Sequence, residues 1–145
     1  MPLPSTRVLV VDDHSAVRRA ICHLLSEDPS LDVICQTSDG EDAVKKAALL
    51  QPDLILLDIS LPGITGIEAA RQIRKVSPDS NIIFLSQHDS LQMVSEALRN
   101  GHGYVTKSDA ALQLLEAVRS VRNGSLFVSK RIADQGWVAD SLSLM

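Results

Sequence analysis

The chain has few cysteines, no long run of basic residues and no long apolar segment. Its two cysteines, Cys22 and Cys35, are too far apart for a C-x-x-C pair, and the N-terminus lacks a charged region followed by an apolar one. We therefore expect buried, reduced thiols in a cytoplasmic protein. Lysine and arginine follow one another only in pairs and the net charge is −4, which argues against binding to a nucleic-acid backbone. No apolar run could span a bilayer, so membrane contact would need a partner.

The length and composition suit one globular domain. The chain has 145 residues, of which 45% are hydrophobic and 22% are charged. These values allow a substantial hydrophobic core. The sequence contains no internal repeat and no low-complexity segment.

A short apolar segment at residues 54–57 lies between Pro52-Asp53 and Asp58. An uninterrupted apolar segment of this length indicates a strand that is buried on both faces, as in a parallel sheet. Asp58 stands at its C-terminal end, which is where ligands bind in open α/β sheets. Asp58 is therefore the first candidate functional residue, although it could merely cap the following loop.

Four further segments have the same apolar character, and helical periodicity separates them. The strands are expected at residues 7–11, 31–35, 54–57, 81–85 and 103–107, and the helices at about residues 16–25, 41–50, 67–76, 91–98 and 110–121. Strict alternation at this spacing predicts an α/β fold, a doubly wound five-stranded parallel sheet with helices on both faces. Asn100-Gly101 and Asn123-Gly124 are expected to close the last two helices, the first pair in the left-handed cap conformation that Asn and Gly tolerate.

Polar residues follow four of the five expected strands. Asp12 and Asp13 end the first, Asp58 the third, Ser86 the fourth and Lys107 the fifth. Converging carboxylates would make an oxygen-rich site that suits Mg²⁺ or Mn²⁺ rather than Zn²⁺, and no Cys/His set is spaced to compete. A lysine can hold an anionic oxygen and a serine can donate to one, so these groups favour phosphoryl transfer to an aspartate. The alternative for the first pair is a solvated helix start.

The sequence resembles the receiver domains of two-component response regulators over about residues 7–124. The motifs are Val-Asp12-Asp13-His, Leu-Leu-Asp58-Ile-Ser-Leu-Pro-Gly-Ile-Thr-Gly66, Phe-Leu-Ser86 and Gly-Tyr104-Val-Thr-Lys107. The resemblance implies the flavodoxin-like receiver fold. It also implies a domain at residues 1–124, followed by a linker at residues 125–145.

The resemblance implies a role for each of these polar residues. Asp58 would be the phosphoacceptor. Mg²⁺ would be bound by Asp13, Asp58 and the carbonyl of Ser60, with Asp12 acting largely through water. Lys107 and Ser86 would contact the phosphoryl group. Tyr104 would be an aromatic switch whose ring turns inward as Ser86 moves, the alternative being a half-buried strand tyrosine with a solvated hydroxyl.

The subfamily resembles the NarL/FixJ type, whose output is a LuxR-type helix-turn-helix. This implies a sensor histidine kinase or phosphotransfer protein as partner, with specificity at residues 16–25, and self-association on phosphorylation. His88 lies where side chains of this family influence the attacking water, or is an ordinary surface residue. His102 is expected to be a solvated loop histidine.

Two alternatives remain open at this point. A haloacid-type aspartyl phosphatase also uses Asp, Mg²⁺, Ser or Thr, and Lys, but it needs an acid two positions after the nucleophile, where this chain has Ser60. An unphosphorylated receiver-like docking module usually lacks an acid or the lysine, and here all are present.

The final segment, residues 125–145, is too apolar for a free tail and too short for a DNA-binding domain. We expect a helix over about residues 130–139 that packs Ile132 and Trp137 on the receiver or on a second copy. Because the segment has only Lys130 and Arg131 as basic residues, we expect no direct DNA binding. The chain would then be a fragment of a longer regulator, with DNA bound through a missing C-terminal helix-turn-helix domain.

Overall fold

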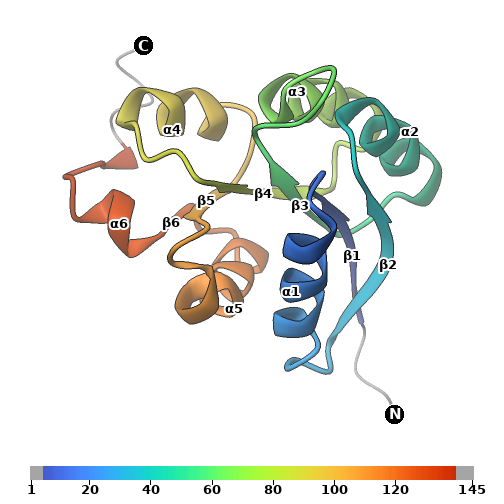
Figure 1. Cartoon of the computed structure of the whole chain (residues 1–145), viewed down its shortest axis with the longest axis horizontal. Coiled ribbons are helices and arrows are strands. Elements are labelled where there is room, and N and C mark those ends of the chain that lie inside the picture. Colours follow the sequence, from blue (N-terminus) through green and yellow to red (C-terminus); the bar gives the residue numbers. More distant parts are fainter. Residues whose placement is uncertain (1–4, 140–145) are drawn as a thin grey trace.

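The computed structural model describes residues 5–139 and contains a parallel sheet with helices on both faces (Figure 1). The strands are β1 (Thr6–Val11), β2 (Leu31–Thr37), β3 (Leu54–Asp58), β4 (Asn81–Ser86), β5 (Gly103–Thr106) and β6 (Phe127–Val128). The helices are α1 (Ser15–Leu25), α2 (Gly40–Leu50), α3 (Gly66–Val76), α4 (Leu91–Leu98), α5 (Ala110–Arg122) and α6 (Lys130–Ala133). Within the described residues the strand order is β2-β1-β3-β4-β5-β6. The predicted α/β class is confirmed.

The number of strands is a correction, because the sequence predicted five and the sheet has six. The sixth strand, β6, pairs in parallel with β5. At the start of β6, the Phe127 N–H donates to the His102 carbonyl at 3.2 Å. Directly after β6, the Ser129 N–H donates to the Tyr104 carbonyl at 2.9 Å. A two-residue strand has no periodicity that a sequence pattern could reveal.

Alternate residues of each central strand pack on opposite faces of the sheet. In β1, Leu9 and Val11 belong to the core beneath α2, α3 and α4, whereas Val8 and Val10 belong to the core beneath α1 and α5. All four side chains are at most 1% exposed. Because both faces are covered by helices, the central strands need apolar residues without interruption. Their polar residues are thereby confined to the strand ends.

Helices α4 and α5 end just before the two Asn-Gly pairs, as the sequence predicted. Gly124 after α5 has a φ of +87°. The left-handed conformation predicted for Asn100-Gly101 is wrong, since neither residue has a positive φ. Gly101 is needed for close packing instead, because a Cβ there would lie 2.5 Å from Cε2 of Phe84.

The C-terminal segment packs on the sheet and on α4, as the sequence predicted for its two anchor residues. Ile132 is 0% exposed and Trp137 is 9% exposed, and both join the core that contains Tyr104. The predicted helix length is wrong, because α6 ends at Ala133 and Gly136 takes a φ of +89° in the following turn. Residues 140–145 of the predicted linker lie outside the described residues.

Cys22 and Cys35 are free, but the prediction that both are buried is wrong. Each is partly exposed. The reason for Cys35 is its position in β2, which is an edge strand of the sheet. Across residues 5–139, the structure has no helix that is both long enough and apolar enough to cross a membrane.

His102 is not the solvated loop residue that the sequence suggested. The imidazole Nδ1 of His102 accepts a hydrogen bond from the backbone N–H of Ile82 at 3.0 Å. The backbone N–H of His102 donates to the Ile82 carbonyl at 2.8 Å. The side chain is half-buried, and this burial, together with the nearby Arg74 cation, lowers the pKa of the His102 imidazole. The ring is thus a neutral acceptor that completes the pairing at the start of β4.

Protonation of His102 should weaken the fold. The pKa of His102 in the folded protein lies below its ordinary value of 6.5. The stabilising contribution of the neutral ring is therefore complete above pH 6.5, and it is lost as the pH falls from there through the folded-state pKa. We expect the wild type to lose more of its free energy of unfolding between about pH 7.5 and about pH 5.5 than His102→Asn, in which an amide oxygen can replace Nδ1. Urea unfolding of both proteins at the two pH values measures this. Equal losses would contradict the assignment.

Candidate functional site

The sheet order brings the predicted polar residues to one edge. From β1 the chain continues to β2 on one side, and β3 lies on the other side of β1, so the connections after β1 and β3 diverge. In doubly wound sheets a crevice forms at this point, outside the carboxyl ends of the strands. Asp12 and Asp13 follow β1 and Asp58 ends β3, at the mouth of this crevice.

Lys107 lies between two buried carboxylates. Its Nζ is 2.9 Å from Oδ2 of Asp12 and 3.1 Å from Oδ2 of Asp58. The Asp12 side chain is 0% exposed and the Asp58 side chain is 3% exposed, so water screens these charges poorly. The backbone N–H of Lys107 donates to the Ser86 carbonyl at 2.8 Å, which fixes the lysine to the end of β4.

The pKa values of Asp58 and Lys107 are both raised, for different reasons. Burial raises the pKa of the Asp58 carboxyl, and the negative charge of Asp12 raises it further. The Lys107 ammonium lowers this pKa but does not cancel the rise. Burial lowers the pKa of the Lys107 ammonium, but hydrogen bonding and charge from Asp12 and Asp58 outweigh burial and raise it. Lys107 therefore remains a cation at neutral pH, and one cation faces several acids.

Asp13 and His14 lie beside Asp12 and Asp58, and these four residues are here called the acidic cluster. The Asp13 side chain is 33% exposed, and its Oδ1 lies 3.1 Å from Nδ1 of His14. One possible ligand atom from each of Asp12, Asp13, His14 and Asp58 lies within 4.8 Å of the others. The sequence analysis assigned no role to His14, although its position directly after the two acids was the available signal. His14 is also the residue before α1, so neither acid caps that helix.

The donor set fits a hard divalent cation. Oδ2 of Asp12 is buried, and within residues 5–139 its ion-pair partner is the Lys107 ammonium, 2.9 Å away. Lys107 is shared with Asp58, so the carboxylates outnumber the cation that balances their buried charge. The three carboxylates suit Mg²⁺ or Mn²⁺ better than Zn²⁺, which favours nitrogen and sulfur ligands, and His14 alone offers nitrogen in this cluster.

Ser86 and Tyr104 meet at the loop between β4 and α4. Ser86 is 0% exposed, and its Oγ accepts a hydrogen bond from the His88 N–H at 3.0 Å. The Tyr104 hydroxyl donates to the His88 carbonyl at 2.8 Å. Tyr104 is itself 0% exposed, which contradicts the alternative of a half-buried tyrosine with a solvated hydroxyl, and burial raises the pKa of its phenol.

His88 also contacts the loop that follows Asp58. Its Nε2 lies 3.1 Å from Oγ of Ser60, and the Ser60 N–H donates to Oδ1 of Asp58 at 3.2 Å. His88 is therefore connected to the acidic cluster through Ser60. The sequence placed His88 near the site but could not reveal its partner.

Gly66 allows the loop after Asp58 to fold back on the strand. Its N–H donates to the Ile59 carbonyl at 2.7 Å. A Cβ at Gly66 would lie 2.1 Å from the Asp58 carbonyl oxygen, so no other residue fits without moving the end of β3. This close approach explains the glycine that begins α3.

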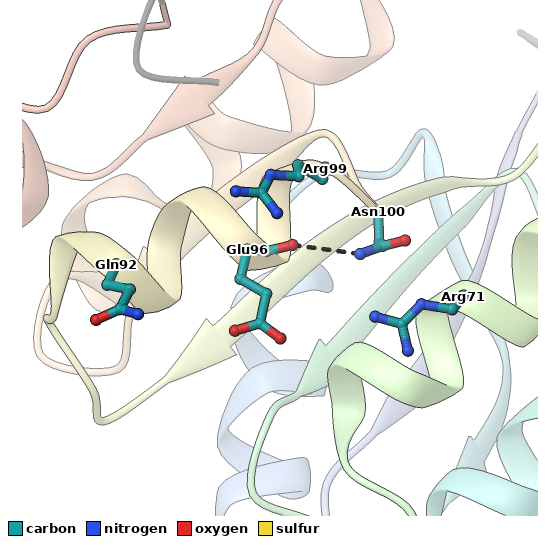
Figure 2. Close-up of a pocket in the computed structure, with 5 residues that line it drawn as sticks. All are labelled: Arg71, Gln92, Glu96, Arg99 and Asn100. Atoms are coloured by element: carbon teal, nitrogen blue, oxygen red, sulfur yellow. Dashed lines mark hydrogen bonds between the residues drawn. The ribbon is translucent and has the colours of Figure 1, made fainter. Parts of the chain in front are cut away.

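A cavity of about 430 Å³, apart from the acidic cluster, lies between α3 and α4 and contains none of the predicted site residues. Figure 2 shows the five side chains that line it, Arg71, Gln92, Glu96, Arg99 and Asn100. The Asn100 amide donates to the Glu96 carbonyl at 3.2 Å. The candidate chemistry is therefore at the acidic cluster and not in this cavity.

The chain matches the response regulator receiver domain family over residues 8–119. It belongs to this family. It is 37% identical to the response regulator GacA of Pseudomonas viridiflava over 130 residues, which are 89% of this chain and 61% of the relative. It is also 37% identical to the response regulator UvrY of Escherichia coli K12, over 88% of this chain and 59% of the relative. The receiver thus spans about three fifths of the length of these relatives.

Solved structures agree with the family and with the NarL/FixJ-like subfamily. A LuxR-family two-component response regulator from Aurantimonas sp. SI85-9A1 has a TM-score of 0.86 at 30% identity, covering 90% of this chain and 94% of that one. Receivers are signalling modules that are generally not enzymes. They bind Mg²⁺ at an acidic pocket, and this receiver has such a cluster.

Removal of one acid should stabilise the receiver when no metal is present. Asp12, Asp13 and Asp58 repel one another, and the Lys107 ammonium pairs with Asp12 and Asp58 but not with Asp13. In EDTA we expect Asp13→Asn to raise the free energy of unfolding by a few tenths to about 1 kcal/mol. Added Mg²⁺ should raise the melting temperature of the wild type more than that of the variant.

The control for this prediction is Asp79→Asn, which changes an exposed acid in the turn before β4. It should unfold like the wild type in EDTA and in Mg²⁺. A melting temperature of Asp13→Asn clearly below that of the wild type in EDTA would refute the repulsion argument.

Proposed function

We propose that this receiver is phosphorylated on Asp58 by a sensor histidine kinase or phosphotransfer protein, in a reaction that requires Mg²⁺. The observation that supports this most directly is the Lys107 ammonium, held 3.1 Å from Oδ2 of Asp58 and 2.9 Å from Oδ2 of Asp12. A cation in this position can stabilise a phosphoryl oxygen beside the acceptor carboxylate.

The transfer step follows from this arrangement. One carboxylate oxygen of Asp58 attacks the phosphorus of a phosphohistidine, so that a P–O bond forms and the P–N bond breaks. The electron pair of the broken bond goes to the imidazole nitrogen of the donor. The Lys107 ammonium moves from Asp58 to a phosphoryl oxygen, and the Ser86 hydroxyl donates to another.

The acidic cluster would hold the metal. Asp13, Asp58 and the Ser60 carbonyl are the proposed ligands, with Asp12 contributing largely through water. A bound Mg²⁺ neutralises the clustered carboxylates and the incoming phosphoryl charge. Asp12 also holds Lys107 in position by its buried oxygen.

Ser86 and Tyr104 form the proposed switch. In the structure the Ser86 hydroxyl accepts from His88, and Tyr104 donates to the same residue. When Ser86 turns toward a phosphoryl oxygen, its bond to the His88 N–H is lost and the β4–α4 loop is free to shift. Tyr104 would follow through its bond to the His88 carbonyl.

A groove beside the site supports docking of the phosphodonor on α1. It has a volume of about 460 Å³ and is lined mainly by small and apolar side chains of α1 and α5. The polar residues Gln87 and Lys107 also line it, so the groove reaches the site. The α1 residues in it are Ala16, Val17, Ala20, Ile21 and Leu24. A helix of the donor protein that lies in this groove would bring its phosphohistidine to Asp58.

The output is proposed to be transcriptional, through a DNA-binding domain of the longer protein and with self-association on phosphorylation. The names of the relatives support a response regulator, and UvrY and GacA are longer than this chain. No observation favours an aspartyl phosphatase. Ser60, where that enzyme class needs an acid, contacts His88 instead.

The phosphoacceptor can be tested by mass. With Mg²⁺ and a small phosphodonor such as acetyl phosphate, we expect the wild type to gain one phosphoryl group and Asp58→Asn to gain none, because the amide is not a nucleophile. Intact-mass spectrometry measures both. Asp79→Asn is the matched control and should be modified like the wild type. A full mass increase in Asp58→Asn would refute the assignment.

Lys107 can be tested by separating modification from response. Lys107→Ala should keep the fold, accept phosphate more slowly and fail to change its self-association when phosphorylated, because no cation then links the phosphoryl group to β5. Mass spectrometry and sedimentation measure the two effects. Lys45→Ala, an exposed lysine on α2, is the control. A wild-type change in association by phosphorylated Lys107→Ala would show that the proposed role is wrong.

A further inference from the structure

Residues 129–137, here called the strap, run from the edge of the sheet to α4. At the sheet, the Ser129 N–H donates to the Tyr104 carbonyl at 2.9 Å and the Ser129 Oγ accepts from the Thr106 N–H at 3.1 Å. At the helix, the Trp137 Nε1–H donates to Oγ of Ser95 at 3.0 Å. Figure 1 shows this segment lying beside β5 and below α4. The strap is thus anchored at both ends.

Between its anchors, the strap holds the β4–α4 loop at one residue, Asp89. The Arg131 Nε–H donates to Oδ2 of Asp89 at 2.8 Å, and the Gln135 amide donates to the Asp89 carbonyl at 2.9 Å. The Arg131 N–H also donates to Oδ2 of Asp109 at 2.8 Å, which fixes the strap to the start of α5. Asp89 therefore receives one contact through its side chain and one through its backbone.

The neighbouring residue, His88, is the one that the site holds. Its N–H donates to Ser86 and its carbonyl accepts from the Tyr104 hydroxyl. Two adjacent loop residues thus contact different parts of the molecule. His88 contacts the switch residues Ser86 and Tyr104, and Asp89 contacts the strap. A movement of the loop that follows Ser86 must change the contacts of Asp89.

We propose that the strap is a regulatory contact that stabilises the unphosphorylated position of the β4–α4 loop and loosens when Asp58 is phosphorylated. The proposal rests on the proposed function, because it needs a phosphoryl group at Asp58 to draw Ser86 away from His88. Loss of the Ser86–His88 hydrogen bond shifts the loop, and the shift separates Asp89 from Arg131 and Gln135. Trp137 then leaves its buried position against Ser95.

The coupling acts in both directions. If occupation of the site weakens the strap, removal of the strap contact must strengthen binding at the site by the same factor. The pair of Arg131 and Asp89 is partly exposed, with side chains 57% and 45% accessible, so the factor is modest. An exposed ion pair of this kind corresponds to about two-fold to five-fold in affinity.

The one tryptophan of the chain reports on the strap. Trp137 is 9% exposed, and the sequence contains no other tryptophan. In the full chain with Mg²⁺, addition of BeF₃⁻ as a phosphoryl mimic should shift the Trp137 emission to longer wavelength and increase its quenching by acrylamide. Unchanged emission and quenching at saturating BeF₃⁻ would overturn the proposal.

Variants at each end of the Arg131–Asp89 contact test the reciprocal effect. Arg131→Ala and Asp89→Asn should each bind BeF₃⁻ about two-fold to five-fold more tightly than the wild type, with Trp137 more exposed before any addition. Lys130→Ala is the matched control, because Lys130 pairs with Asp134 inside the strap and does not touch the loop. It should behave like the wild type.

The outcomes separate this inference from the proposed function. If acetyl phosphate adds no phosphoryl group to the wild type, the proposed function fails. If the group is added to Asp58 but Arg131→Ala and Asp89→Asn bind BeF₃⁻ with wild-type affinity, the strap proposal alone is refuted. An equal gain in affinity for Lys130→Ala would also refute it, since that variant leaves the loop contact intact.

Discussion

The ionic contacts of Lys107 with Asp12 and Asp58 are the constraint on which the site depends. Two carboxylates this deeply buried would be costly together without a cation, and Lys107 supplies one at about 3 Å from each. These three residues follow or end β1, β3 and β5, so the contact also holds the ends of three strands in register. A fold that moved any of these strands along its axis would break it.

The rigidity behind this contact comes from the two cores on either side of the sheet. The central strands are apolar on both faces, as Leu54, Ile55, Leu56 and Leu57 in β3 show, each 0% exposed. A strand packed in this way cannot turn or slide by one residue without exposing one face or creating overlap on the other. The polar residue at its end is thereby held in place, while the loops beyond remain able to move.

The loop between β4 and α4 is where the site and the C-terminal segment meet. His88 contacts Ser60, Ser86 and Tyr104, and the next residue, Asp89, contacts Arg131 and Gln135. In the functions proposed above, a change at Asp58 passes through hydrogen bonds at His88 to ion-pair and backbone contacts at Asp89. These are surface contacts of modest strength, which suits a reversible switch better than a permanent joint.

The sequence by itself determined the alternation of strands and helices and the polar residues that end the strands, because an apolar run and a helical period depend only on neighbours along the chain. Asp58 and Lys107 could be selected in this way. Only the tertiary structure decided what those residues touch. The strand β6, the acceptor role of His102, the contact of His88 with Ser60 and the contact of Arg131 with Asp89 each join residues at least 20 positions apart. Such pairings leave no periodic signal, because they arise from the folding of one segment against another.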